Sequence, residues 1–225
     1  MQDSNEKLEI VDGVSYRYSA SWIQSLESED HWRLYWRQQK IMQGFVVRGQ
    51  HVLEMGVGSG FTANYLQSKG IDVTTVDIDA EKRPDIVANI VKYPFVDSYD
   101  HILAFEIFEH VPFDAFRNVL ERIVCVCKGN LFLSVPRNQV RWFMISVQLP
   151  KLGSHSFSIK APRGKIKEKS HFWEVGHNGI TRSKLESTFR EAGFEILAQE
   201  EAFSRLFYVL NSPNVQKRKA VKILS

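Results

Sequence analysis

The sequence predicts a single α/β domain built on a doubly wound, mostly parallel sheet, with helices on both faces and an antiparallel hairpin near the C-terminal end. Strand-like and helix-like segments alternate from about residue 50 to 193, the pattern of parallel βαβ units. The last two strand-like segments, 194–199 and 203–210, are too close in sequence to be parallel neighbours, which need a long crossover between them. A chain of 225 residues suffices for one such domain and is short for two.

The individual elements follow from apolar periodicity and from glycine stops. The clearest helix has apolar residues at steps of three and four, from Phe113 to Cys127. Ser183 and Glu186 have capping-box spacing at the start of the last helix. Residues 137–180 interrupt the alternation and are expected to be irregular. The other predicted elements are helix 29–43, strand 51–55, helix 61–69 ending at Gly70, strands 72–78, 85–90, 101–105 and 131–135, and a helix from Thr181 or Ser183 to Gly193.

Composition and charge favour a cytoplasmic protein without a membrane span or a nucleic-acid-binding face. No apolar run approaches the roughly 18 residues of a transmembrane helix, and the N-terminal residues lack the apolar core of a secretory signal. The two cysteines, Cys125 and Cys127, are too close in sequence to pair and are expected to be reduced. The net charge of +3 arises from the segment 160–169 and the tail 217–222, whereas the rest of the chain is mildly acidic.

A glycine-rich turn follows the strand over 51–55 and opens the next helix, the context of a nucleotide-binding turn. We expect Gly56 to permit the tight turn, Gly58 to let a ligand approach the backbone, and Gly60 to let the helix start close to the strand. Phe61 stands where a dinucleotide-binding turn has glycine or alanine, and the Glu54 carboxylate would repel a pyrophosphate. A ligand with a sulfonium and an ammonium group would tolerate that charge, so the turn favours S-adenosylmethionine over NAD.

An acidic residue ends the second predicted strand, 17 residues after Gly60. At this position the Asp77 carboxylate would accept hydrogen bonds from both ribose hydroxyls of a bound adenosine. If the strand ends later, Asp79 takes this role. The alternative is a solvated acid at a strand end.

The segments VLEMGVGSGFTA, TVDID and DIVANIVKYPFVDSYDHILAFEIFEHV together resemble the class I S-adenosylmethionine-dependent methyltransferase family over about residues 50–135. The resemblance implies a seven-stranded sheet with one antiparallel strand, and S-adenosylmethionine as the cofactor. It places the three glycines at the methionine part of the cofactor and Asp77 at the ribose. Asn89 stands where the family more often has aspartate. The remaining implied cofactor contacts are Ile78 against the adenine, Asn89 at the adenine amino group, Ile90 beside it, and Phe105 at the end of the fourth strand.

The cluster Glu106, Glu109 and His110 follows the fourth strand, where the family presents the reactive methyl group. His110 with its neighbouring carboxylates could act as a general base, or the cluster could be structural and hold the methionine end of the cofactor. The E-x-x-E-H spacing also resembles the metal-binding motif of some ubiquinone-biosynthesis and small-RNA 2′-O-methyltransferases. A divalent metal would then need a further ligand such as His171 or His177. We favour the structural role, rank the base second, and assign no metal ligands.

On this resemblance, residues 1–225 form one methyltransferase domain that acts on a small-molecule acceptor. We divide it into an N-terminal helical cap (1–48), a cofactor-binding half (49–135), a lid or substrate insertion (137–180) and a basic tail (214–225). The Asn-Pro-Pro-Tyr element of amino-methylating nucleic-acid enzymes is absent, which makes nucleic acid an unlikely partner. The alternatives are an RNA- or phosphate-directed methyltransferase that uses the basic segment 160–169, and a non-catalytic Rossmann-like nucleotide-binding protein.

Overall fold

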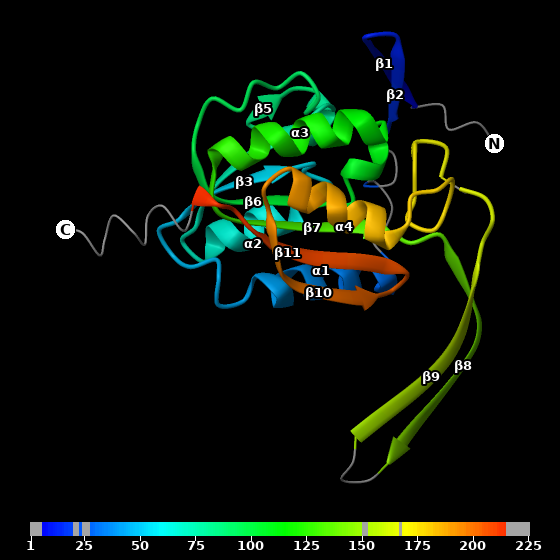
Figure 1. Ribbon diagram of the computed structural model, residues 1–225. Helices are drawn as coiled ribbons and strands as arrows, with labels where there is room; N and C mark the ends of the chain where they lie inside the picture. Colours follow the sequence, from blue (N-terminus) through cyan, green and yellow to red (C-terminus); the bar gives the residue numbers. More distant parts are fainter. Residues whose placement is uncertain (1–5, 20–22, 24–27, 150–152, 167, 215–225) are drawn as a thin grey trace.

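The centre of the chain is a seven-stranded sheet, seen in a computed structural model that describes residues 6–19, 23, 28–149, 153–166 and 168–214 (Figure 1). The strands of this sheet are β3 (His51–Met55), β4 (Asp72–Asp77), β5 (Ile86–Val87), β6 (Tyr99–Phe105), β7 (Cys127–Pro136), β10 (Glu195–Ala202) and β11 (Arg205–Asn211). They lie in the order β10-β11-β7-β6-β3-β4-β5. The first strand of this sheet in sequence, β3, lies inside it, with β4 and β5 on one side and the later strands on the other. The doubly wound fold is therefore confirmed.

Strand β11 alone runs against the direction of its neighbours in this sheet. It pairs antiparallel with both β7 and β10, whereas β3, β4, β5, β6 and β7 pair in parallel. Residues 203 and 204, both with positive φ, form the tight connection between β10 and β11. The predicted C-terminal hairpin is therefore confirmed.

Helices cover both faces of the sheet (Figure 1). They are α1 (Glu29–Met42) and α2 (Phe61–Ser68) on one face, and α3 (Phe113–Val126) and α4 (Arg182–Glu191) on the other. Neighbouring strand residues point to opposite faces, so Ile102 packs with α3 while Leu103 packs with α1 and α2. Thr181 caps α4, since its Oγ1 accepts a hydrogen bond from the Lys184 N–H at 3.0 Å. The expectation of a cap at Ser183 is wrong, because Ser183 already lies inside the helix.

Two hairpins outside the main sheet correct the predicted organisation. In the expected helical cap, β1 (Lys7–Val11) and β2 (Val14–Tyr18) pair antiparallel and precede α1. In the segment expected to be irregular, β8 (Gln139–Leu149) and β9 (Gly153–Pro162) form a long hairpin that projects from the body (Figure 1). The described residues of that segment after β9, 163–166 and 168–180, follow an irregular path against the domain. The division of the chain into functional parts stays a prediction.

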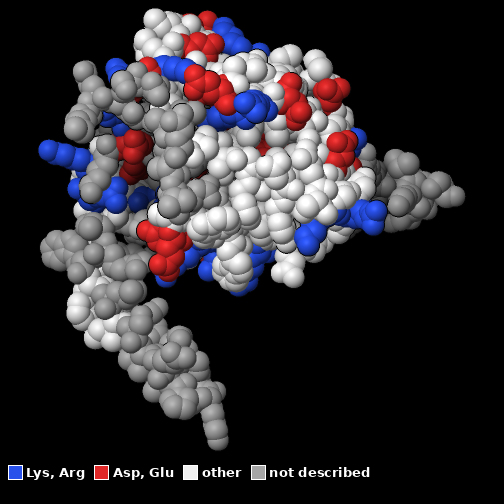
Figure 2. Space-filling view, turned by 180° about the vertical axis from the view of Figure 1, so that it is seen from behind, with Lys and Arg blue, Asp and Glu red and all other residues white. Residues whose placement is uncertain are grey.

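The face formed by α1 and α2 has a broad area without charged side chains (Figure 2). Several exposed aromatic residues belong to these two helices, namely Trp32, Trp36 and Tyr65. Among the described helices, none is long and apolar enough to cross a membrane. Apart from its first residue, Asn214, the predicted basic tail lies outside the described residues.

Candidate functional site

The glycine turn between β3 and α2 has a backbone that requires glycine at three positions. Gly56, Gly58 and Gly60 have φ angles of 79°, 55° and 79°, in the left-handed region that side chains disfavour. A Cβ atom on Gly56 would lie 1.9 Å from Cδ1 of Ile107, which belongs to the segment after β6. Gly60 is the N-cap of α2. The glycines therefore let the turn lie against the segment that contains Ile107 and let α2 begin immediately after it.

Phe61, which departs from the dinucleotide-binding pattern, belongs to an aromatic cluster between α1 and α2. Its ring stacks on that of Tyr35 with a centroid distance of 4.6 Å, and it meets the Trp32 ring edge to face with a centroid distance of 5.1 Å. The Tyr35 hydroxyl is hydrogen-bonded to Ser59 Oγ at 2.8 Å. The first helix thus fixes the position of the glycine turn, a contact that strand and turn patterns did not reveal.

Glu54 lies on β3 beneath the turn and is buried, with 5% of its surface exposed. Within the part of the chain that the structure describes, its Oε2 atom has no hydrogen-bond partner. Burial raises the pKa of Glu54 to about 8, helped by the charge of Asp77 and opposed by a hydrogen bond from the Ala63 backbone. At neutral pH this carboxyl is therefore mostly protonated, rather than the fixed negative charge that the sequence analysis assumed.

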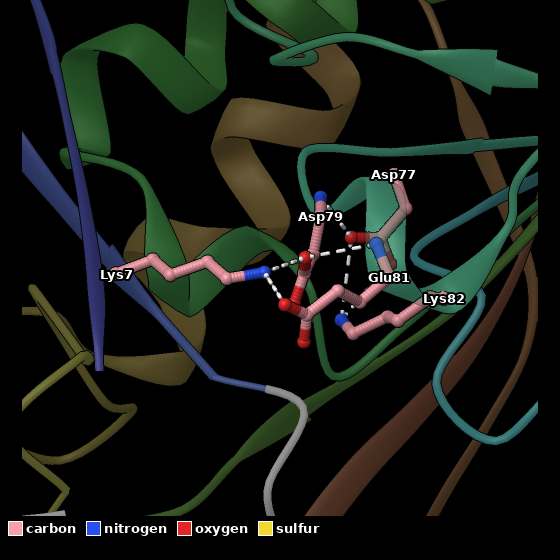
Figure 3. Close-up of polar contacts among 5 residues, drawn as sticks. All are labelled: Lys7, Asp77, Asp79, Glu81 and Lys82. Atoms are coloured by element: carbon pink, nitrogen blue, oxygen red, sulfur yellow. Dashed lines mark hydrogen bonds and ion pairs between the residues drawn. The ribbon is translucent and has the colours of Figure 1, made fainter. Parts of the chain in front are cut away.

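Asp77 ends β4, and its carboxylate is fully engaged (Figure 3). Oδ2 accepts a hydrogen bond from the Val57 N–H at 2.9 Å, which ties it to the glycine turn. Oδ1 accepts from the Asp79 N–H at 2.8 Å. The Lys82 ammonium contacts both oxygens, at 3.2 and 3.0 Å. Asp77 is thus at the strand end expected from the sequence, and its contact with a ribose stays a prediction.

The N-terminal hairpin approaches the same edge of the sheet. Lys7 on β1 forms ion pairs with Asp79 at 2.7 Å and with Glu81 at 2.8 Å (Figure 3). Burial by itself would raise the pKa of Asp79, but hydrogen bonds from Lys7 and the Glu81 N–H hold it below its usual range. Asp79 therefore contacts the hairpin, a pairing that no local sequence pattern indicated.

The residues expected near the adenine lie beside this acidic edge. Asn89 is buried, donates a hydrogen bond to Glu9 at 3.3 Å and accepts one from the Val91 N–H at 3.0 Å. Ile90 is buried and Ile78 is partly buried, both within or against the main core. Phe105 ends β6 and packs against the core on the α1 and α2 face. The structure places these side chains near the expected strand ends, and their contacts with a cofactor remain predictions.

Glu106 is held by two neighbouring strands. Its φ is 56°, an unusual conformation for a residue other than glycine. Oε1 accepts a hydrogen bond from Ser134 Oγ at 2.8 Å, and Oε2 accepts one from Arg205 Nε at 2.7 Å. Strained backbone of this kind persists only where the surroundings hold it, as Ser134 on β7 and Arg205 on β11 do here.

Glu109 and His110 lie in a short 3-10 helix, η3 (Phe108–His110). Glu109 is fully buried, and neither carboxylate oxygen has a hydrogen-bond partner among the described residues. Burial raises its pKa well above the usual range, and the charge of Glu106 adds to this. Burial, with a further contribution from the nearby His171, lowers the pKa of His110 to about 4. A histidine with so low a pKa is a weak general base at neutral pH.

His171 comes from the irregular segment after β9 and meets this cluster. Its ring lies 4.8 Å from that of His110, centroid to centroid. The Phe172 N–H donates to the Glu109 carbonyl at 2.8 Å, which anchors the segment to η3. His171 Nδ1 is 3.0 Å from Oε1 of the buried Glu174. Of the two histidines considered in the sequence, His171 joins the cluster, whereas His177 lies outside the group of convergent ligand atoms.

The glycine turn, Asp77 and the Glu109 cluster all follow the carboxyl ends of β3, β4 and β6, the edge where ligands bind in open α/β sheets. The charge of Lys82 contributes to lowering the pKa of His110, which links the Asp77 side to the histidine side. Two shallow hollows of 470 and 490 Å³ open on the α1 and α2 face, but neither is lined by Asp77 or Glu109. The side chains of Lys7 and Lys82 fill the space beside the acids (Figure 3).

A family model described as a methyltransferase domain matches residues 39–199 of this chain. That stretch includes the glycine turn, Asp77 and the Glu109 cluster. No curated protein matches the sequence closely enough to report.

Several solved structures share the fold at low sequence identity. A chain in the complex between a methyltransferase activator and a methyltransferase from Haloferax volcanii is 17% identical, with 86% of this chain and 97% of that chain covered and a TM-score of 0.58. A SAM-dependent methyltransferase from Aquifex aeolicus is 15% identical, with 87% and 99% covered and a TM-score of 0.57. A Burkholderia thailandensis 1,6-didemethyltoxoflavin N1-methyltransferase, solved with that acceptor and S-adenosylhomocysteine, is 14% identical, with 94% and 97% covered and a TM-score of 0.52.

Proposed function

This chain belongs to the class I S-adenosylmethionine-dependent methyltransferases through its methyltransferase domain, and we propose that it methylates a small-molecule acceptor at the carboxyl edge of the sheet. The proposal rests above all on the hydrogen bond from the Val57 N–H to Asp77. This bond joins the glycine turn to the carboxylate expected to receive the ribose. The methyl donor, when bound, supplies a methyl group already activated by a sulfonium.

The chain's own residues fit such a cofactor. The three glycines leave the turn without side chains where the methionine part would lie. A carboxylate accepts hydrogen bonds only, so Asp77 can take two ribose hydroxyls if the Lys82 ammonium moves aside. A lysine side chain is a flexible four-carbon chain, so the Lys82 ammonium can move aside while its backbone stays in place. We assign Gly56, Gly58, Gly60 and Asp77 to cofactor binding.

Charge around the site favours a small acceptor over a nucleic acid. On the acceptor side Glu109 and Glu174 are buried and Arg205 is engaged by Glu106, so these residues offer a phosphate backbone no free cation. Part of the basic segment 160–169 is held against the domain, because Asn138 contacts the backbone of residues 164 and 165. We infer a small acceptor on this ground, with no support for an RNA-directed activity from the acceptor side.

The test is methyl transfer from labelled S-adenosylmethionine to a cell extract separated by ultrafiltration. We expect protein-dependent label in the fraction of small molecules, and much less when Asp77→Asn protein replaces the wild type at a subsaturating concentration of the methyl donor. Ribonuclease and protease treatment of the retained fraction should leave the incorporation unchanged. Label found only in the retained fraction, and lost with ribonuclease, would reject the small-molecule acceptor while keeping the methyltransferase activity.

A further inference from the structure

Three potential metal ligands converge from two segments that are about 60 residues apart in the sequence. Glu109, His110 and His171 each offer one ligand atom, and these atoms all lie within 4.8 Å of one another. Two hydrogen bonds hold the segments together, from the Phe172 N–H to the Glu109 carbonyl and from Trp173 Nε1 to the Val111 carbonyl at 3.0 Å. The geometry is therefore built into the fold and does not depend on chance contacts of surface side chains.

Glu109 carries the strongest indication that a ligand is missing from this cluster. The residue is 0% exposed, and both carboxylate oxygens lack a hydrogen-bond partner among the described residues. A buried carboxylate without partners is costly, and native proteins almost always satisfy such groups. A cation held between the oxygens and the two imidazoles would satisfy the carboxylate.

Both histidines are turned so that one ring nitrogen is already engaged. His171 Nδ1 lies 3.0 Å from Glu174 Oε1, and the other oxygen of Glu174 accepts a hydrogen bond from Asn138 Nδ2 at 2.8 Å. His110 Nδ1 lies 3.3 Å from the Ser170 carbonyl. Each ring therefore keeps Nε2 for another partner. Metal-binding histidines characteristically donate their second N–H to a carboxylate or a carbonyl, which fixes the tautomer and the ring orientation.

We propose that Glu109, His110 and His171 bind a divalent transition metal ion, with Glu174 and Asn138 as positioning residues. Two imidazole nitrogens and one carboxylate oxygen suit Zn²⁺, Mn²⁺, Fe²⁺ or Co²⁺ better than Mg²⁺ or Ca²⁺, which prefer oxygen ligands. Glu106 is not a ligand in this arrangement, because Ser134 and Arg205 occupy its carboxylate. This differs from the E-x-x-E-H spacing considered from the sequence.

Three protein ligands leave coordination positions open on such an ion. Resting on the proposed function, we infer that the acceptor reaches these positions with oxygen atoms, as a hydroxyl, a vicinal diol or an enol would. An acceptor that offers two oxygens is favoured, since a metal with three protein ligands commonly takes further oxygen ligands.

Metal binding is tested directly, without relying on turnover. The full chain is treated with EDTA, dialysed, and titrated with CoCl₂ while the visible absorption is followed, and with ZnCl₂ and MnCl₂ by calorimetry. We expect one ion per chain and a cobalt spectrum that reports nitrogen and oxygen ligands. His171→Gln should weaken binding at least 100-fold, whereas Glu174→Gln, which only misorients His171, should weaken it about 10- to 100-fold. His31→Gln, on α1 and outside the cluster, is the matched control and should bind as the wild type does.

Wild-type protein that binds none of the three ions stoichiometrically would overturn the inference, as would undiminished binding by folded His171→Gln. If Glu109→Gln fails to fold, the His171 and Glu174 variants still decide the outcome. Titration of the metal-free protein with S-adenosylhomocysteine separates this inference from the proposed function. Cofactor binding without metal binding rejects the metal site alone, and loss of both rejects the wider account of the site.

Discussion

Replacing Glu54 with glutamine is expected to remove a large pH dependence of stability. Burial raises the pKa of this side chain to about 8, from its ordinary value of 4.5 in the unfolded chain. Between these two values the folded protein holds a proton that the unfolded chain has released. The free energy of unfolding therefore falls as the pH rises through this window.

The size of the effect follows from the separation of the two pKa values. Each unit corresponds to about 1.4 kcal/mol, so the full separation is worth about 5 kcal/mol as a ceiling. That is a large share of the roughly 5–15 kcal/mol of stability of a typical domain. Glutamine keeps the shape of the side chain and cannot ionise, so the variant should lose this contribution to the pH dependence.

Urea unfolding followed by tryptophan fluorescence measures the difference. The free energy of unfolding of Glu54→Gln relative to the wild type should increase by several kcal/mol between about pH 5 and about pH 9. Glu121→Gln, an exposed glutamate on α3, is the matched control and should follow the wild type. Parallel pH dependences for Glu54→Gln and the wild type would refute the reasoning, because Glu54 would then ionise as readily in the folded as in the unfolded protein.

The remaining predictions concern the expected cofactor site. Asp77→Asn should weaken S-adenosylhomocysteine binding by about 1.5–3 kcal/mol, since it removes a charge-assisted acceptor; calorimetry on the folded variant with unchanged affinity would assign the ribose elsewhere. Lys82→Met should bind S-adenosylhomocysteine at least as tightly as the wild type, because it removes the cation that competes for Asp77; a large loss of affinity would show that Lys82 contacts the ligand. Gly56→Ala should lower the free energy of unfolding by about 2–4 kcal/mol through its positive φ and its clash with Ile107, measured by urea unfolding. When Ile107→Ala is combined with Gly56→Ala, the free energy of unfolding should recover only by the part that was lost through the clash.

The central sheet and the glycine turn were predictable because their signals are local. Strand and helix periodicities differ, and the turn needs glycine at defined backbone angles, so Gly56, Gly58 and Gly60 could be identified in order along the chain. The position of Asp77 at the end of β4 followed from the same alternation.

The N-terminal hairpin was missed although its signal was present. Asp12 and Gly13 both have positive φ, and an Asp-Gly pair between strand-like segments is a strong hairpin turn signal. The pairs from this hairpin to Asp79 and Asn89 join residues more than 70 positions apart. No spacing rule within a short segment can indicate contacts of this kind.

The acceptor side was predictable only in part. Glu106, Glu109 and His110 lie within five residues of one another in the sequence, but the side chains that surround each of them belong to other helices, strands and loops. Arg205 on β11 engages Glu106, whereas no residue that the structure describes hydrogen-bonds the Glu109 carboxylate. His171 could be named as one of two candidates, and only the folded chain shows which of them reaches the cluster. Its approach depends on the anchoring of residues 171–174 against η3, which leaves no periodic trace in the sequence.

Calorimetric titration of the wild-type protein with S-adenosylhomocysteine, and in parallel with NAD, tests the cofactor site most directly. We expect one S-adenosylhomocysteine per chain and no detectable binding of NAD, because Phe61, whose ring stacks on Tyr35, stands where a dinucleotide-binding turn has glycine or alanine. Folded protein that binds NAD as well as S-adenosylhomocysteine, or that binds neither, would contradict the assignment of the glycine turn and Asp77 to the methyl donor.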